Sequence, residues 1–150
     1  MNISLDILKK LRAETSAGVS DCRQALEDAK GDYVKAKKLV NERGIEKAAK
    51  KADRKTGAGI IESYVHGGRV GVLLEIRCET DFVARTDNFK TLAHEVALQI
   101  AAMNPKNVKE LLKEEYIRDP ALTVEALIKQ TIARLGENIT ISQFHRMELA

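Results

Sequence analysis

Ile60-Ile61-Glu62-Ser63-Tyr64-Val65-His66-Gly67-Gly68 is the stretch of sequence that decides the fold of this chain. Apolar and β-branched residues lead up to a Gly-Gly pair, and a second apolar run from Val70 to Cys78 follows it. Two such runs around a Gly-Gly pair predict an antiparallel β-hairpin, because glycine adopts the positive φ angles of a tight turn. The preceding segment from Thr56 to Gly59 favours a linker.

Upstream of the hairpin, apolar residues recur at helical spacing. The expected helices run from a Ser4 cap to about Thr15, from Ser20 to about Ala29 and from an Asp32 cap to Gly44, with a further basic helix from Ile45 to Lys55. The third helix is expected to stop at Gly44 because glycine is common just after a helix C-terminus. Three short helices leave little room for a pocket, which indicates a recognition module rather than a catalytic one.

Downstream of the hairpin, the pattern predicts helices over Asn88–Met103, Val108–Glu115 and Thr123–Leu135, and a strand over Ile139–Glu148 that returns to the hairpin. The predicted fold class is α+β: an N-terminal three-helix module, a linker helix, and a three-stranded antiparallel sheet with packed helices. The predicted domains are residues 1–55 and residues 56–150. Such a sheet has at least one free edge, which a second copy of the chain, a helix or charged residues could cover.

Composition and charge narrow the class of function. The 150 residues include no Trp and only 4% aromatic residues, so the core is expected to be aliphatic and base stacking is disfavoured. Residues 1 to 55 hold 14 Lys or Arg against 9 Asp or Glu, whereas the remainder holds 11 against 13. The basic front third is either a solvated helical face or a footprint for nucleic acid or an acidic protein surface.

No constellation of residues points to catalysis or to a cofactor. The two cysteines, Cys22 and Cys78, lie far apart, and the three histidines fall in different elements, so a disulfide framework or a metal site is not expected. No segment has the features of a membrane span or a targeting peptide, which favours a reducing, cytoplasmic setting. We expect a protein that acts by binding another protein; RNA or ribosome binding through the basic N-terminal helices is the alternative.

An acid and an aromatic stand together where the second hairpin strand ends, in the segment Cys78-Glu79-Thr80-Asp81-Phe82-Val83-Ala84-Arg85. Connections of this kind carry function more often than cores do. Phe82 is expected to be either buried or exposed for a partner. Asp81 either contacts that partner or serves the first turn of the next helix, where a carboxylate favours the helix dipole.

Three motifs in the same order resemble the bacterial elongation factor Ts family. They are the stretch from Leu11 to Leu26, the segment from Cys78 to Arg85, and Leu135-Gly136-Glu137-Asn138-Ile139 followed by Phe144 and Arg146. The first motif is similar to the ubiquitin-associated-like (UBA-like) helical module that opens members of this family. Together the motifs span almost the whole chain.

The resemblance implies a guanine-nucleotide exchange factor for elongation factor Tu, without covalent chemistry and without a cofactor or metal of its own. It assigns Thr80, Asp81, Phe82 and Val83 to a segment that dislodges Mg²⁺ from the partner, with Phe82 as a wedge. It also assigns docking of the N-terminal module to Leu11, Val19 and Ser20, although the commoner family pattern has larger apolar residues at the last two positions.

Length is a further departure from the family pattern. The chain resembles a short form, because it supplies one hairpin, one set of helices and one closing strand, without the second core half and inserted helical hairpin of longer members. The missing half and the free sheet edge together predict a symmetric homodimer.

Overall fold

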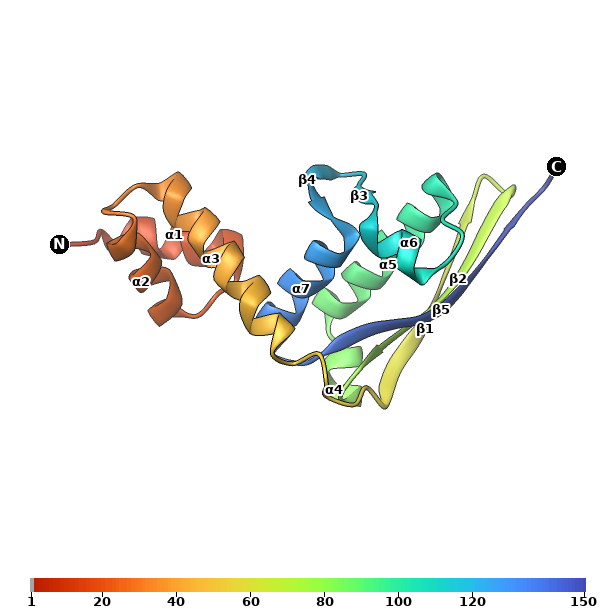
Figure 1. Cartoon of the computed structure of the whole chain (residues 1–150), viewed down its shortest axis with the longest axis horizontal. Coiled ribbons are helices and arrows are strands. Elements are labelled where there is room, and N and C mark those ends of the chain that lie inside the picture. The colour runs from red at the N-terminus through yellow and green to blue at the C-terminus, as the bar shows by residue number, and fades with distance from the viewer. Residues whose placement is uncertain (1) are drawn as a thin grey trace.

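The structure is a computed structural model that describes residues 2–150. Its first half contains α1 (Leu5–Thr15), α2 (Val19–Asp28), α3 (Tyr33–Ala49), β1 (Ala58–His66) and β2 (Val70–Cys78). Its second half contains α4 (Asp81–Ala84), α5 (Asp87–Met103), α6 (Val108–Lys113), β3 (Glu115–Tyr116), β4 (Asp119–Thr123), α7 (Val124–Leu135) and β5 (Ile139–Glu148). The molecule is elongated, with the bundle of α1, α2 and α3 at one end and the β1-β2-β5 sheet at the other (Figure 1).

The helical bundle forms largely where its capping residues predict. The Ser4 hydroxyl accepts a hydrogen bond from the Asp6 N–H, and Asp32 accepts one from the Lys35 N–H at 3.1 Å, so both expected N-caps are confirmed. The second helix begins at Val19, one residue before the expected start. The core of the bundle is small and mainly aliphatic, and it consists of Leu8, Leu11, Cys22, Ala25, Leu26, Ala29, Ala36 and Val40.

The expected stop at Gly44 is wrong. Helix α3 continues to Ala49, so the separate basic helix predicted over Ile45–Lys55 is only the last part of α3 followed by a turn. A Cβ atom placed on Gly44 would lie 3.3 Å from the Cβ of Ala133 in α7. This glycine therefore permits close packing of α3 on α7. Ala48, near the end of α3, already belongs to the core on the sheet side, while the domain division at residue 55 stays a prediction.

The predicted hairpin and closing strand are confirmed. Strand β2 is central in the order β1-β2-β5, and both pairings are antiparallel. Gly67 and Gly68 have φ angles of 56° and 68°, as the tight turn requires. Ala58 and Gly59 belong to β1 rather than to the expected linker. A small β3-β4 hairpin, which the sequence patterns did not predict, follows α6.

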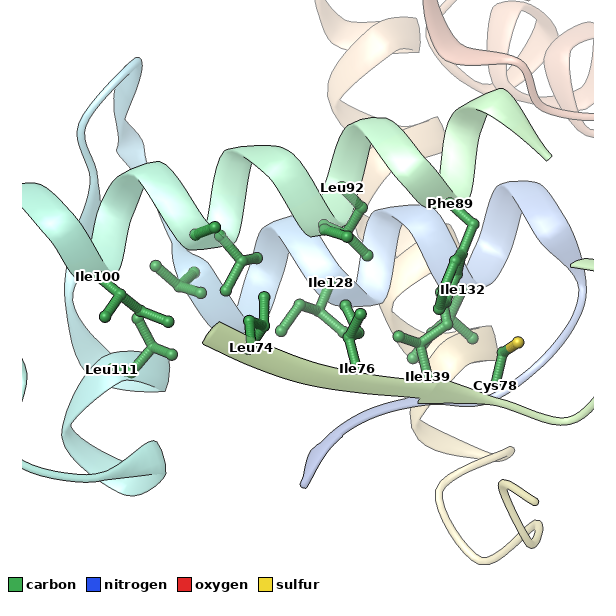
Figure 2. Close-up of a cluster of buried hydrophobic side chains, with 14 of the residues drawn as sticks. Leu74, Ile76, Cys78, Phe89, Leu92, Ile100, Leu111, Ile128, Ile132 and Ile139 are labelled. Atoms are coloured by element: carbon green, nitrogen blue, oxygen red, sulfur yellow. The ribbon is translucent and has the colours of Figure 1, made fainter. Parts of the chain in front are cut away.

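One face of the sheet is covered by helices. Alternate residues of β2 point toward α5 and α7 (Figure 2), because successive side chains of a strand face opposite sides. The labelled core residues are Leu74, Ile76, Cys78, Phe89, Leu92, Ile100, Leu111, Ile128, Ile132 and Ile139. The core is mainly aliphatic, as composition predicts. No helix within residues 2–150 is long and apolar enough to cross a membrane.

Candidate functional site

The segment from Thr80 to Val83, here called the corner segment, connects the central strand to the helical layer. Strand β2 ends at Cys78, and the four-residue helix α4 starts at Asp81. Val83 packs into the core, which fixes the inner side of α4. Phe82 points outward with 80% of its surface exposed. The structure thus resolves the question that the sequence left open: Phe82 is not a core residue.

The cap of α4 is Thr80 and not Asp81. The Thr80 hydroxyl accepts a hydrogen bond from the Val83 N–H at 3.3 Å, as an N-cap residue does. Asp81 occupies the first turn, where its carboxylate is favourable to the helix dipole but does not form the cap. The Asp81 and Phe82 side chains are both exposed and adjacent in sequence, so the corner segment presents an acid and an aromatic ring together.

A residue far away in the sequence holds Thr80. The Thr80 N–H donates to Glu137 Oε1 at 3.0 Å, and the Thr80 hydroxyl donates to Glu137 Oε2 at 2.8 Å. Glu137 follows Gly136, which ends α7 in the left-handed conformation with φ 76°. Both oxygens of one carboxylate therefore bind the residue that caps α4.

A second set of contacts lies next to the first. The Asn138 N–H donates to Glu79 Oε1 at 2.8 Å. The Asn138 side-chain amide donates to the carbonyl oxygens of Ala52 and Arg54, at 3.3 and 2.9 Å. Arg54 also forms an ion pair with Glu79, with 3.6 Å between Arg54 Nη1 and Glu79 Oε1. Asn138 is buried, and it joins the connection after α3 to the corner and to the start of β5.

Cys78, the last residue of β2, is fully buried. The Cys78 thiol donates to the Thr80 carbonyl at 3.2 Å. Burial raises the pKa of the Cys78 thiol, and the negative charge of Glu137 adds to this effect. Because the thiolate is the nucleophilic form, Cys78 is a structural residue here rather than a reactive one.

Sequence reasoning did not single out Glu137 or Asn138 as site residues. The available signal was their place in the Leu135–Ile139 motif: a charged residue and an amide directly follow a helix-ending glycine, just before a strand. Residues in such a turn often bond to neighbouring backbone. Their partners at positions 79 and 80 are brought close only by the pairing of β5 with β2.

Comparison with known proteins decides the family. The family model for Elongation factor TS matches residues 79–150. Elongation factor Ts of Thermoanaerobacter sp. (strain X514) is 40% identical over 192 residues, which cover 97% of this chain and 94% of the relative. Elongation factor Ts of Fervidobacterium nodosum is 40% identical over 195 residues, with 99% of each chain covered. The chain belongs to the elongation factor Ts family. The resemblance carried by the three sequence motifs is thereby confirmed.

This chain is shorter in its interior than these elongation factor Ts relatives. Its 150 residues cannot fill an alignment of 192 positions, so at least 42 aligned positions have no residue here. Because 97% of this chain and 94% of the relative are aligned, most of the difference in length comes from internal segments that the relative has and this chain lacks, rather than from the ends.

The three docking residues that the elongation factor Ts resemblance assigns differ in their exposure to solvent. Leu11 is fully buried in the bundle core, so its side chain offers no surface to a partner and instead supports the fold. Val19 is 48% exposed, and Ser20 beside it is exposed at the start of α2. The N-cap of this helix is Gly18, which has no side chain to form a capping hydrogen bond.

Acidic neighbours pair with part of the basic charge on α3. Lys47 Nζ lies 2.8 Å from Asp21, and Arg43 forms an ion pair with Asp28. Both pairs tie α3 to α2, and each leaves one positive charge fewer to attract phosphate groups. Within residues 2–150, no group of three or more His, Cys, Asp or Glu side chains is arranged to hold a metal ion.

Proposed function

We propose that this protein promotes GDP release from elongation factor Tu by inserting Phe82 next to the Mg²⁺- and phosphate-binding region of that GTPase. Membership of the elongation factor Ts family supports the general role. The single observation that supports this site is the 80% exposure of Phe82 on a short helix whose other side is packed into the core. A large aromatic residue of this kind is typical of a binding hot spot.

The corner segment would act through shape and charge. Phe82 would occupy a position between partner side chains, and the Asp81 carboxylate would bring a negative charge toward a region that already holds phosphates. In GTPases of this kind, Mg²⁺ bridges phosphate oxygens and protein side chains, so displacement of the metal weakens nucleotide binding. Thr80 and Val83 would serve by holding α4, since the first caps it and the second anchors it.

Thermodynamic linkage makes such a factor reusable. A factor that weakens nucleotide binding by some ratio must itself bind the nucleotide-free partner more tightly by the same ratio. No bond in the nucleotide has to form or break, so we propose an exchange factor and not an enzyme in the covalent sense. Free GTP would then displace the factor by mass action.

The N-terminal module would supply a second contact through Val19 and Ser20. The two contacts are carried by separate elements, α2 and α4, at different places along the elongated molecule (Figure 1). Docking would raise the effective concentration of the corner segment at its target. Leu11 would contribute by holding α1 in the bundle rather than by contact.

A second copy of the chain is the proposed partner for the uncovered face of the sheet. Ile61, Val65, Leu73 and Met147 are all exposed there. Val65 and Met147 both lie opposite Gly71 in the pairing register, and Leu73 lies two residues further along β2, so these three side chains form an apolar strip that Ser63, Glu75 and His145 border. A symmetric dimer would bury this strip. Sedimentation of the chain as a monomer at micromolar concentration would refute this part of the proposal.

The direct experiment is release of labelled GDP from elongation factor Tu as a function of the concentration of this protein. A concentration-dependent acceleration that saturates is expected, and no acceleration would refute the proposed function. RNA binding through the basic end of α3 and the turn after it is the competing outcome: it would show as affinity for RNA that falls steeply with salt and that depends on Lys50 and Lys51.

A further inference from the structure

We propose that Glu137 is the positioning residue of the corner segment: it sets the pose in which Phe82 meets the partner. This inference rests on the proposed function, because it assigns Glu137 a part in the same exchange reaction. Glu137 does not need to touch the partner. It would act through Thr80, to which it is joined by two hydrogen bonds.

The geometry makes Thr80 the link between Glu137 and Phe82. The Thr80 hydroxyl donates to Glu137 and accepts from the Val83 N–H, so one oxygen atom serves both the carboxylate and the cap of α4. The Thr80 N–H adds the second bond to the same carboxylate. Two parallel bonds fix the orientation of a residue as well as its position. Phe82 follows two residues later within a helix of only four residues.

Glu137 is itself held firmly on both sides. Gly136 before it closes α7, and Asn138 after it is buried with three hydrogen bonds to residues 52, 54 and 79. Residues 79 and 80 thus bond to residues 138 and 137, respectively. The position of α4 is therefore fixed by contacts with the end of α7 and the start of β5, as well as by its own neighbours in the chain.

A helix of one turn needs such external support. Isolated short helices are unstable in water, because nucleation fixes several residues for a single hydrogen bond. Without Glu137, the corner segment would have to become ordered when it meets the partner, and that ordering would offset part of the interaction free energy. The docking surface at Val19 and Ser20 would be unaffected. We therefore expect a lower maximal rate of GDP release at an unchanged half-saturating concentration.

The test compares Glu137→Ala and Glu137→Gln with Glu125→Gln. Glu125 lies in the first turn of α7, at the opposite end of that helix from Glu137, and pairs with Lys129. Its change therefore removes one acidic charge without altering the contacts of Thr80. The expected maximal acceleration of GDP release falls about tenfold in Glu137→Ala and less in Glu137→Gln, because an amide keeps one acceptor oxygen. Glu125→Gln is expected to match the unmodified protein.

Two further readouts separate positioning from general stability. Amide hydrogen exchange at Thr80 and Val83 is expected to accelerate about tenfold in Glu137→Ala, with the core amides of β2 unchanged. Thr80→Val removes the hydroxyl bond to Glu137 but keeps the bond from the backbone N–H. In a double-mutant cycle with Glu137→Ala the two effects are therefore expected to be less than additive, because both variants lack the hydroxyl–carboxylate bond. A merely structural role would instead lower the fraction of active protein, which raises the apparent half-saturating concentration and leaves the maximum unchanged.

The outcomes distinguish this proposal from the proposed function. If the unmodified protein does not accelerate GDP release, the proposed function fails, and this inference fails with it even where amide exchange shows that Glu137 holds Thr80. If the protein is active but Glu137→Ala retains the full maximal rate, the proposed function stands and the positioning role is overturned. Unchanged amide exchange at Thr80 in Glu137→Ala, or additive effects in the cycle, would overturn it as well.

Discussion

Gly44 of α3 packs against Ala133 of α7 so closely that a Cβ atom on Gly44 would lie 3.3 Å from the Cβ of Ala133. This contact lies where the bundle meets the helices that cover the sheet (Figure 1). Arg134, the next residue of α7, donates to the carbonyl oxygen of Thr15 at 3.2 Å. The orientation of the bundle on the sheet domain is thus fixed by close packing and by a side-chain hydrogen bond.

A larger side chain at position 44 should weaken this packing. Gly44→Leu is expected to lower the free energy of unfolding by about 1–3 kcal/mol, although leucine is the better helix former, because the surrounding helices must move apart. Urea denaturation measures the change. Ala133→Gly in the same chain should recover part of the loss by vacating space. Equal losses with and without Ala133→Gly would contradict the packing argument.

Phe82→Ala should reduce exchange without loss of the fold. Since the ring is 80% exposed, its removal is expected to change the free energy of unfolding by less than about 0.5 kcal/mol. The maximal rate of GDP release should fall by about 30-fold, equivalent to about 2 kcal/mol for a hot-spot residue. Met103→Ala, another exposed side chain at the far end of α5, is the control and should retain activity. A folded, fully active Phe82→Ala protein would remove the wedge from the mechanism.

Val19→Ser should act on binding rather than on the maximal rate. The substitution removes apolar surface that docking would bury, worth about 1 kcal/mol, so the half-saturating concentration should rise about fivefold. Titration of GDP release at increasing concentrations of the protein separates the two parameters. Val34→Ser, which changes an exposed valine on α3, should leave both parameters unchanged. A lower maximum for Val19→Ser would show that the two contacts are not independent.

Asn138→Ala should destabilise the whole chain. The substitution removes the donors to the carbonyl oxygens of Ala52 and Arg54 at a buried site, and the expected loss in free energy of unfolding is about 1–3 kcal/mol. Asn138→Asp should cost more at neutral pH, because a carboxylate would face two carbonyl oxygens. Urea denaturation followed by circular dichroism tests both variants. Equal stability of the aspartate and asparagine forms would contradict the donor role.

Acid should remove a contribution from Glu75 on the uncovered face of the sheet. Hydrogen bonds from Ser142, Arg77 and Gln143 lower the pKa of Glu75 from 4.5 to about 2. A carboxylate with a lowered pKa stabilises the folded state above its unfolded pKa, and this contribution is lost as the pH falls through the folded pKa. The difference in stability between the protein and Glu75→Gln should therefore shrink from about pH 5 to about pH 2. A constant difference over this range would contradict the assignment.

Local signals in the sequence predicted most of the elements. The predicted caps at Ser4 and Asp32 lie where short polar side chains precede apolar repeats, and each accepts the expected backbone N–H. Thr123, predicted as the first residue of its helix, is the N-cap of α7. Gly67 and Gly68 likewise predict their own turn, because both adopt the positive φ angles that it requires. These features depend on residues within one or two turns of each other, so a single sequence is sufficient to find them.

Apart from the short, local β3-β4 hairpin, the main features that the sequence did not predict depend on distant residues. Gly44 has the local appearance of a helix end, but Ala133 decides its role from the opposite helix. The candidate site also depends on a distant residue. The local motif was enough to single out Thr80, Asp81 and Phe82, but the hydrogen bond from Thr80 to Glu137 joins residues 57 positions apart. No local pattern specifies which carboxylate will face a given hydroxyl once the sheet has formed.

Helix α3 is one unbroken rod that takes part in two cores. Ala36 and Val40 lie in the core of the bundle, and Ala48 lies in the core beneath the sheet. The span from Val19 to Phe82 is therefore set by a rigid part rather than by a flexible connection. Under the proposed function, this fixed spacing would let the protein select a partner by the distance between two surfaces as well as by their chemistry. A GTPase whose two binding surfaces lie closer together or farther apart would contact either Val19 or Phe82, but not both at once.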